Sequence, residues 1–127
     1  MADKKRILLI EDDIFLRELC TIKLEKSQYS VDVAADGTQG LALLQSKSYD
    51  LVLLDIMLPE INGFEVLEKY ISDRQEGEAK PYIMMMTNLS EKEQIDKAKD
   101  LGADDYIVKA HYSPTEIVKR VNEILQS

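Results

Sequence analysis

The sequence predicts an α/β fold in which helices cover both faces of a doubly wound parallel sheet. Short apolar runs alternate strictly with amphipathic stretches along the whole chain. The third and fourth of these runs are apolar on both faces, as strands buried beneath helices are. Because parallel strands require long, right-handed crossover connections, this alternation indicates one open sheet with five strands and five helices.

Each predicted strand is a run of four or five residues that lies between stretches of helical period. The runs lie at 6–10, 31–34, 51–55, 82–86 and 106–109. The stretches between them repeat apolar residues at intervals of three and four, which gives each helix one apolar stripe. In the first helix that stripe contains Leu16, Leu19, Cys20 and Leu24.

Helix boundaries are indicated by residues that cap helix ends. Ser90 with Glu93, and Ser113 with Glu116, have the spacing of capping boxes, which predicts the starts of the fourth and fifth helices. Asp13 is expected to cap the first helix. Gly102 follows an apolar residue, as a glycine at a helix C-terminus does.

Composition excludes several classes of protein. A chain of 127 residues fits one domain, and we expect that domain to span 1–127. The net charge of −8 argues against a nucleic-acid surface, and one cysteine with one histidine argues against a zinc site. We expect a cytoplasmic protein without a membrane partner, because no apolar run is long enough for a bilayer and no signal peptide is recognisable.

Polar side chains follow four of the five predicted strands. Glu11 and Asp12 follow the first strand, Asp55 ends the third, Thr87 follows the fourth, and Lys109 ends the fifth. The carboxyl ends of parallel strands meet at one edge of a sheet, where ligands of such folds bind. This edge therefore combines carboxylates suited to a hard cation with a hydroxyl and an ammonium group.

Four motifs at these strand ends carry a resemblance to a known family. They are "LLIEDD" at 8–13, "LVLLDIMLPEINGFEVL" at 51–67, "MMTNLS" at 85–90 and "GADDYIVKA" at 102–110. In this order and spacing they resemble the receiver domain of bacterial two-component response regulators, especially single-domain members such as the chemotaxis regulator. The resemblance implies a flavodoxin-like fold with strand order 2-1-3-4-5, and aspartyl phosphorylation that depends on Mg²⁺.

Matched position by position, the resemblance implies that Asp55 is the phosphoacceptor. It implies that Glu11 and Asp12 are the acidic pair that holds Mg²⁺. Mg²⁺ prefers an octahedron of oxygen atoms that includes waters, so Asp12, Asp55 and the backbone carbonyl of Met57 would suit it, with Glu11 acting largely through water.

Three further residues complete the implied site. Lys109 would neutralise one phosphoryl oxygen and the Thr87 hydroxyl would donate to another. The family also implies a switch in which Tyr106 turns inward when Thr87 moves toward the phosphoryl group. Tyr106 would be a core aromatic residue in any case, and the two roles are compatible.

The resemblance also implies the partners. A histidine kinase or a phosphotransfer domain would supply the phosphoryl group, and the chain would catalyse only its own phosphorylation and dephosphorylation, so it is not expected to be an enzyme. A downstream protein would bind the face made by the fourth helix, fifth strand and fifth helix. The chain would be a monomer or a phosphorylation-dependent dimer.

Two positions depart from the family pattern. Asn88 stands where a smaller residue is usual, and Ala110 stands where proline usually follows the lysine. A cis bond before alanine would cost about 2.5–4 kcal/mol, against about 0.5–1 kcal/mol before proline. We therefore expect a trans Lys109–Ala110 bond, and a loop that is more mobile than the other strand ends.

Other classes of protein fit these residues less well. A phosphatase of the haloacid dehalogenase type needs a second acid two residues after the nucleophile, where this chain has Met57. A flavodoxin needs a Ser/Thr/Gly-rich phosphate loop, whereas Glu11, Asp12 and Asp13 would repel a phosphate. A receiver-like module that works without phosphorylation, and a receiver excised from a larger transcription regulator, remain as alternatives.

Overall fold

The structure, a computed structural model, describes residues 3–126 and confirms the predicted fold class. It contains one parallel sheet of five strands in the order β2-β1-β3-β4-β5. The strands are β1 (Arg6–Ile10), β2 (Ser30–Ala34), β3 (Leu51–Leu54), β4 (Tyr82–Thr87) and β5 (Asp105–Val108). The helices are α1 (Ile14–Lys26), α2 (Gly37–Ser46), α3 (Gly63–Asp73), α4 (Lys92–Asp100) and α5 (Pro114–Leu125), with a 3₁₀ turn η1 (Lys109–His111).

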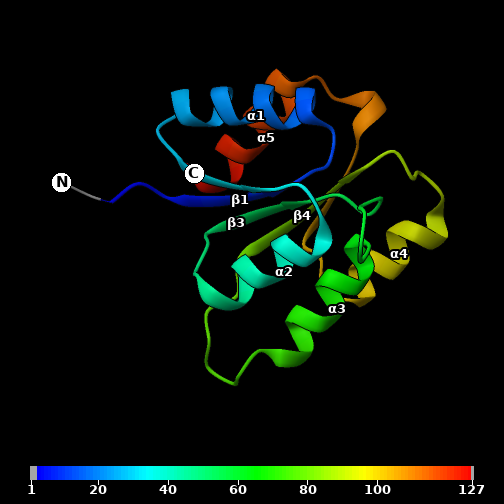
Figure 1. Ribbon diagram of the computed structural model, residues 1–127. Helices are drawn as coiled ribbons and strands as arrows, with labels where there is room; N and C mark the ends of the chain where they lie inside the picture. Colours follow the sequence, from blue (N-terminus) through cyan, green and yellow to red (C-terminus); the bar gives the residue numbers. More distant parts are fainter. Residues whose placement is uncertain (1–2, 127) are drawn as a thin grey trace.

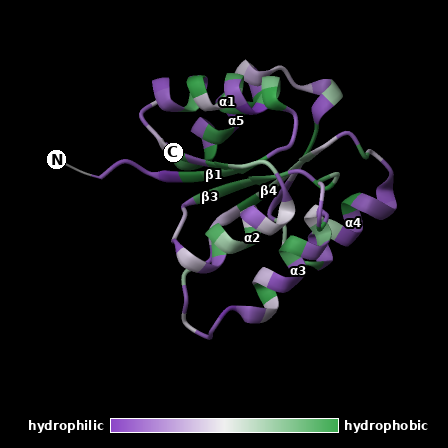
Figure 2. Cartoon of the chain, viewed as in Figure 1, coloured by the Kyte–Doolittle hydropathy of each residue, from purple (hydrophilic) through white to green (hydrophobic). Residues whose placement is uncertain are grey.

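The helices cover both faces of the sheet. Helices α1 and α5 lie on one face, and α2, α3 and α4 lie on the other (Figure 1). The hydrophobic strands form the middle layer, and the helices carry hydrophilic residues outward (Figure 2). Among the described residues, no helix is long and apolar enough to cross a membrane.

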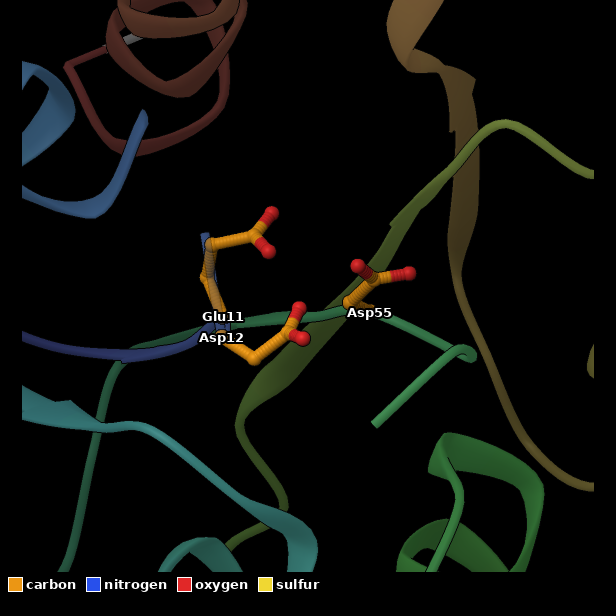
Figure 3. A group of neighbouring side chains, drawn as sticks. All are labelled: Glu11, Asp12 and Asp55. Atoms are coloured by element: carbon orange, nitrogen blue, oxygen red, sulfur yellow. The ribbon is translucent and has the colours of Figure 1, made fainter. Parts of the chain in front are cut away.

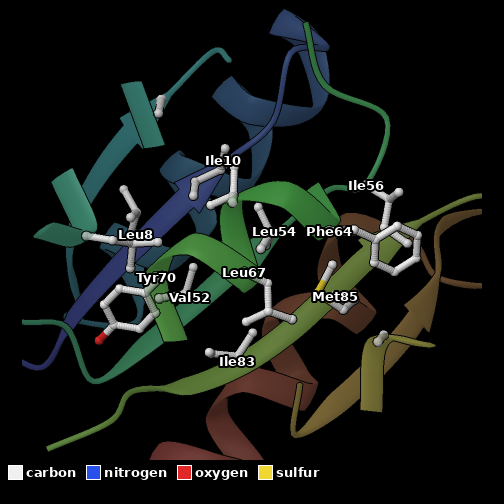
Figure 4. Packing of buried hydrophobic residues seen from close by; sticks show 14 of the residues in the cluster. Leu8, Ile10, Val52, Leu54, Ile56, Phe64, Leu67, Tyr70, Ile83 and Met85 are labelled. Atoms are coloured by element: carbon white, nitrogen blue, oxygen red, sulfur yellow. The ribbon is translucent and has the colours of Figure 1, made fainter. Parts of the chain in front are cut away.

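Alternate residues of the strands divide the core in two, because successive side chains point to opposite faces. Ile7 and Leu9 pack with Cys20 and Leu24 beneath α1 and α5. Leu8 and Ile10 belong to the other cluster, which packs beneath α2, α3 and α4; Figure 4 shows part of this cluster, with Leu8 and Ile10 labelled. All four of these β1 residues are fully buried, so β1 is fixed from both sides.

Helix α1 buries a narrower stripe than the sequence predicts. Cys20 and Leu24 are fully buried, but Leu19 is 45 % exposed, so its assignment to the stripe was wrong. The remaining apolar side chains of α1 that face solvent are Ile14, Phe15 and Ile22. Burial raises the pKa of the Cys20 thiol to about 11, which keeps it protonated and unreactive at neutral pH.

The predicted helix boundaries are confirmed at three of four places. Asp13 caps α1, the capping box of Ser113 and Glu116 starts α5, and Gly102 follows α4 in a left-handed conformation with φ of 110°. The capping box of Ser90 and Glu93 was wrong. The carbonyl of Glu91 accepts the first helical bonds of α4, so Glu91 is the N-cap and Ser90 lies outside the helix.

The start of α3 lies directly against the end of β3. A Cβ atom on Gly63 would lie 2.2 Å from the Asp55 carbonyl oxygen, so only glycine permits this approach. The Gly63 N–H donates to the Ile56 carbonyl at 2.8 Å, and a capping box of Asn62 and Glu65 fixes the first turn. The segment after Asp55 is therefore held at both ends.

Candidate functional site

The register of the sheet places Glu11 beside Asp55. Ile10 is paired with Leu54, so the residues that follow them leave the ends of β1 and β3 side by side. The Asp55 N–H donates to the Ile10 carbonyl at 3.1 Å, and the Glu11 N–H donates to the Ala34 carbonyl at 3.0 Å. These bonds extend the ladder by one step and fix both backbones.

Glu11, Asp12 and Asp55 form one cluster, as the sequence predicts. One carboxylate oxygen from each residue lies within 4.8 Å of the others, and Figure 3 shows the three side chains gathered at the strand ends. Glu11 is 0 % exposed and Asp55 is 3 % exposed, whereas Asp12 faces solvent. Burial raises the pKa of the Glu11 carboxyl, with a further rise from the charge of Asp55, although Lys109 opposes the rise.

Lys109 lies between the two buried carboxylates. Its Nζ donates to Asp55 Oδ2 at 2.6 Å and forms a second ion pair with Glu11 Oε1. Burial by itself lowers the pKa of Lys109, but the hydrogen bonds and charges of Asp55 and Glu11 outweigh it, and the pKa is raised above its ordinary value. The ammonium is therefore fully charged at neutral pH.

The second oxygen of Asp55 is held by the chain that follows it. Its Oδ1 accepts the N–H of Met57 at 3.1 Å. No hydrogen bond among the described residues ends on the Met57 carbonyl oxygen, which leaves that oxygen available as a ligand. The Met57 side chain is 63 % exposed and lies outside the core.

Thr87 and Tyr106 lie on the neighbouring strands. Thr87 ends β4, is fully buried, and its Oγ1 accepts the N–H of Leu89 at 3.5 Å. The Tyr106 hydroxyl, from β5, donates to the Leu89 carbonyl at 2.6 Å, and the Tyr106 ring packs against the core beneath α3 and α4. Both side chains therefore contact the same residue of the β4–α4 loop.

The peptide bond after Lys109 is trans, as predicted for a chain with alanine at 110. Residues 109–111 form the 3₁₀ turn η1, and the Tyr112 N–H closes it with a 3.2 Å bond to the Lys109 carbonyl. Lys109 reaches both carboxylates from this turn. The greater mobility expected for the loop remains a prediction.

Two contacts at the site were missed from the sequence. Arg17 Nη1 donates to the carbonyl oxygens of Glu11 at 2.8 Å and Asp12 at 3.4 Å. Nothing in the residue pattern distinguishes this arginine from a solvent-exposed one. The capping box of Asn62 and Glu65 was also missed, although the spacing of these two residues in the sequence could have predicted it.

The donor set fits a hard divalent cation. Three carboxylates with a free backbone carbonyl nearby supply only oxygen ligands, and the exposure of Asp12 leaves room for the waters that Mg²⁺ retains. Zinc sites prefer nitrogen and sulfur ligands, which this cluster does not offer.

Comparisons with known proteins identify the family. The family model described as the response regulator receiver domain matches residues 7–122. The chain belongs to this family. A receiver domain protein of Methanospirillum hungatei, described as CheY-like, has 32% identity and a TM-score of 0.85 over 97% of this chain and 94% of its own.

The curated relatives of this receiver domain are longer proteins. The transcriptional regulatory protein ResD of Bacillus subtilis is 35% identical over 98% of this chain and 50% of its own length. The transcriptional regulator RpaA of Synechocystis is 36% identical over 95% of this chain and 49% of its length. The chain therefore spans about half the length of these relatives. It is a receiver of two-component systems, a family that interacts with histidine kinases and downstream effectors.

Proposed function

We propose that this receiver accepts a phosphoryl group on Asp55 in a Mg²⁺-dependent reaction and then changes a partner-binding face. The observation that carries the proposal is the setting of Asp55. Its carboxylate is nearly fully buried at a strand end, paired with Lys109 and adjacent to two further carboxylates. A buried carboxylate requires a reason, because burial disfavours ions that are not paired or bound to a cation.

The proposed reaction is a displacement at phosphorus. One carboxylate oxygen of Asp55 attacks the phosphorus of a phosphohistidine, a P–O bond forms and the P–N bond breaks, and its electron pair stays on the imidazole. Such transfers depend mainly on positioning and charge neutralisation. The Met57 N–H and Lys109 orient the Asp55 carboxylate, and Lys109 would remain beside the transferred group to offset its charge.

Glu11, Asp12, Asp55 and the Met57 carbonyl would hold Mg²⁺, with Glu11 acting largely through water. When bound, Mg²⁺ would offset the negative charge of the phosphoryl oxygens. The carboxylates of the pocket repel one another and an incoming phosphoryl group, so the site needs positive charge beyond that of Lys109.

Phosphorylation is tested by intact-mass spectrometry with acetyl phosphate. With Mg²⁺ the wild-type protein should gain one phosphoryl group, and EDTA should prevent it. Asp55→Asn should gain none, and Asp12→Ala should gain far less than wild type. Full labelling of the Asp55→Asn protein would contradict the acceptor assignment. Absence of labelling in wild type, with Mg²⁺ bound, would favour a receiver-like module that works without phosphorylation.

The proposed switch uses Thr87 and Tyr106. The Thr87 hydroxyl would leave Leu89 and donate to the phosphoryl group, and this shift would favour the inward position of Tyr106. Because both side chains contact Leu89, movement of either one would alter the β4–α4 loop and the face made by α4, β5 and α5.

The coupling is tested by Thr87→Ala. This variant should still be labelled on Asp55, but its amide NMR spectrum should show smaller phosphorylation-dependent shifts in α4 and β5 than wild type. Ser72→Ala, which alters an exposed hydroxyl on α3, is a matched control and should respond as wild type does. Equal shifts in the Thr87→Ala and wild-type proteins would contradict the coupling.

The remaining parts of the proposal concern the chain and its partners. The receiver domain would span 1–127 and would work in the cytoplasm as a monomer or a phosphorylation-dependent dimer. A histidine kinase or phosphotransfer domain would donate the phosphoryl group, and the chain would catalyse its own dephosphorylation. The length of the curated relatives supports the alternative that the receiver is part of a larger transcription regulator.

A further inference from the structure

The loop between β1 and α1 has two backbone carbonyls that neither the sheet nor the helix uses. The Glu11 N–H continues the sheet ladder, whereas the Glu11 carbonyl accepts a hydrogen bond from a side chain, and α1 begins only at Ile14. The Glu11 carbonyl, which belongs to a fully buried residue, needs another donor, because an unpaired buried carbonyl is destabilising. Arg17, from the first turns of α1, supplies that donor to both Glu11 and Asp12.

The Asp12 side chain differs from those of Glu11 and Asp55 in how it is held. In the part of the chain that the structure describes, no hydrogen bond or ion pair reaches the Asp12 carboxylate. Glu11 and Asp55, by contrast, are each fixed by Lys109 and by a backbone N–H. The place of the Asp12 carboxylate therefore depends on its backbone, and Arg17 binds that backbone on both sides of the Asp12 Cα.

Arg17 also leaves the acidic side chains free. Its guanidinium contacts the backbone of Glu11 and Asp12 but forms no ion pair with any carboxylate of the described residues. An arginine that paired with Asp12 would compete with a cation for the same oxygens. Arg17 contacts carbonyl oxygens, so it positions the loop and leaves the carboxylate oxygens available to a cation.

We propose that Arg17 is a positioning residue for cation binding, which holds the β1–α1 loop so that the Asp12 carboxylate meets those of Glu11 and Asp55. The inference rests on the proposed function, because it concerns the same Mg²⁺ site. Arg17 would resemble residues that hydrogen-bond to the ligands of a metal and orient them without binding the metal themselves.

Charge and positioning predict opposite effects when Arg17 is replaced. Removal of a positive charge near an acidic site strengthens cation binding, because a repulsive charge is lost. Loss of the two hydrogen bonds weakens it, because the Asp12 carboxylate is no longer held. The sign of the change in Mg²⁺ affinity therefore separates the two explanations.

The experiment compares Arg17→Met, Arg17→Lys and Lys26→Met with wild type by Mg²⁺ titration, followed through amide NMR shifts at neutral pH. Methionine keeps a long apolar stem and removes all donors, whereas lysine keeps the charge and one donor group. Lys26→Met removes a charge from the last turn of the same helix, far along the chain from the loop. Metal-free carbonyl ¹³C shifts of Glu11 and Asp12 report the hydrogen bonds directly.

Arg17→Met should weaken Mg²⁺ binding roughly tenfold, the low end of the loss that outer-shell partners produce. Arg17→Lys should lie between Arg17→Met and wild type, and Lys26→Met should bind Mg²⁺ at least as tightly as wild type. If Arg17→Met does not fold, the weaker binding of Arg17→Lys carries the test, because its charge is unchanged.

Two results would overturn the proposal for Arg17. One is Arg17→Met or Arg17→Lys binding Mg²⁺ as tightly as wild type; the other is unchanged carbonyl shifts of Glu11 and Asp12 in Arg17→Met. Failure of the wild-type protein to bind Mg²⁺ is a different result. It would overturn the cation site of the proposed function itself, and the role of Arg17 with it.

Discussion

At the scale of single residues, Lys109 supplies the positive charge that compensates the buried carboxylates of the site. Its ammonium contacts Asp55 and Glu11, and both carboxylates are almost inaccessible to solvent. Two buried carboxylates with one ammonium leave one negative charge without compensation. A bound cation would compensate this charge, so the pocket is suited to cation binding.

Replacement of this lysine should destabilise the protein in a way that Mg²⁺ reverses. Lys109→Met removes one partner of a buried ion pair, and we expect a loss of roughly 3 kcal/mol in the free energy of unfolding in EDTA. Excess Mg²⁺ should recover more stability in this variant than in wild type, since the cation then supplies the missing positive charge. Urea unfolding followed by circular dichroism, with EDTA and with Mg²⁺, measures both effects.

Lys92→Met is the matched control for this prediction. Lys92 pairs with Asp96 on α4 at 3.1 Å, but both side chains are largely exposed, so the change should cost less than about 0.5 kcal/mol. If Lys109→Met were as stable as Lys92→Met in EDTA, the buried ion pairs of Lys109 would not contribute to stability as predicted.

At the scale of secondary-structure elements, the starts of α4 and α5 differ in their caps: α5 has a capping box, whereas α4 has no side-chain cap hydrogen bond. Ser113 accepts the Glu116 N–H at 3.1 Å, and Glu116 accepts the Ser113 N–H at 2.9 Å. These hydrogen bonds, led by the one from the Ser113 backbone, lower the pKa of Glu116. Because the pKa of Glu116 is lower in the folded state, its carboxylate stabilises the fold at pH values above the ordinary pKa of 4.5. This stability is lost as the pH falls through the folded-state pKa.

Two serine substitutions compare the cap that Ser113 forms with the cap that residue spacing alone predicts for Ser90. Ser113→Ala should lower the free energy of unfolding by about 1 kcal/mol, because the α5 N-terminus loses its side-chain acceptor. Ser90→Ala should change it by less than about 0.5 kcal/mol, because Ser90 makes no cap hydrogen bond. Urea unfolding at pH 7 measures both values, and an equal loss in the two variants would be inconsistent with Glu91 as the N-cap of α4.

Binding of Mg²⁺ should stabilise the whole molecule, because the site exists only when β1 and β3 are paired. A ligand that binds only the folded state adds about 2.7 kcal/mol at about 100 times its Kd. The thermal midpoint should therefore rise with Mg²⁺ at constant ionic strength. Scanning calorimetry against a NaCl series measures the rise.

Asp12→Asn is the control for the site in that experiment. Asp12 is exposed and its carboxylate has no partner among residues 3–126, so the variant should be at least as stable as wild type in EDTA, since repulsion among the carboxylates falls. It should nevertheless lose most of the rise with Mg²⁺. A midpoint that rises equally in both proteins would place Mg²⁺ elsewhere on the surface.

The sequence determined the order of elements and the edge at which the site forms. Strict alternation of apolar runs and helical stretches predicts a parallel sheet, and parallel strands bring Glu11, Asp55, Thr87 and Lys109 to one edge whatever the loops do. The trans bond at Ala110 followed from backbone energetics alone. The strand order came from the resemblance and not from the pattern.

Only the tertiary structure decided which atoms meet at that edge. Lys109 and Asp55 are 54 residues apart, and the ion pair of Lys109 with both carboxylates depends on the path of η1 after β5. Residue spacing likewise does not predict the bonds of Arg17 to the β1–α1 loop, or Glu91 instead of Ser90 as the N-cap of α4. The physical reason is that local patterns fix backbone periodicity and burial, whereas a side-chain contact also requires the relative placement of elements that only packing sets.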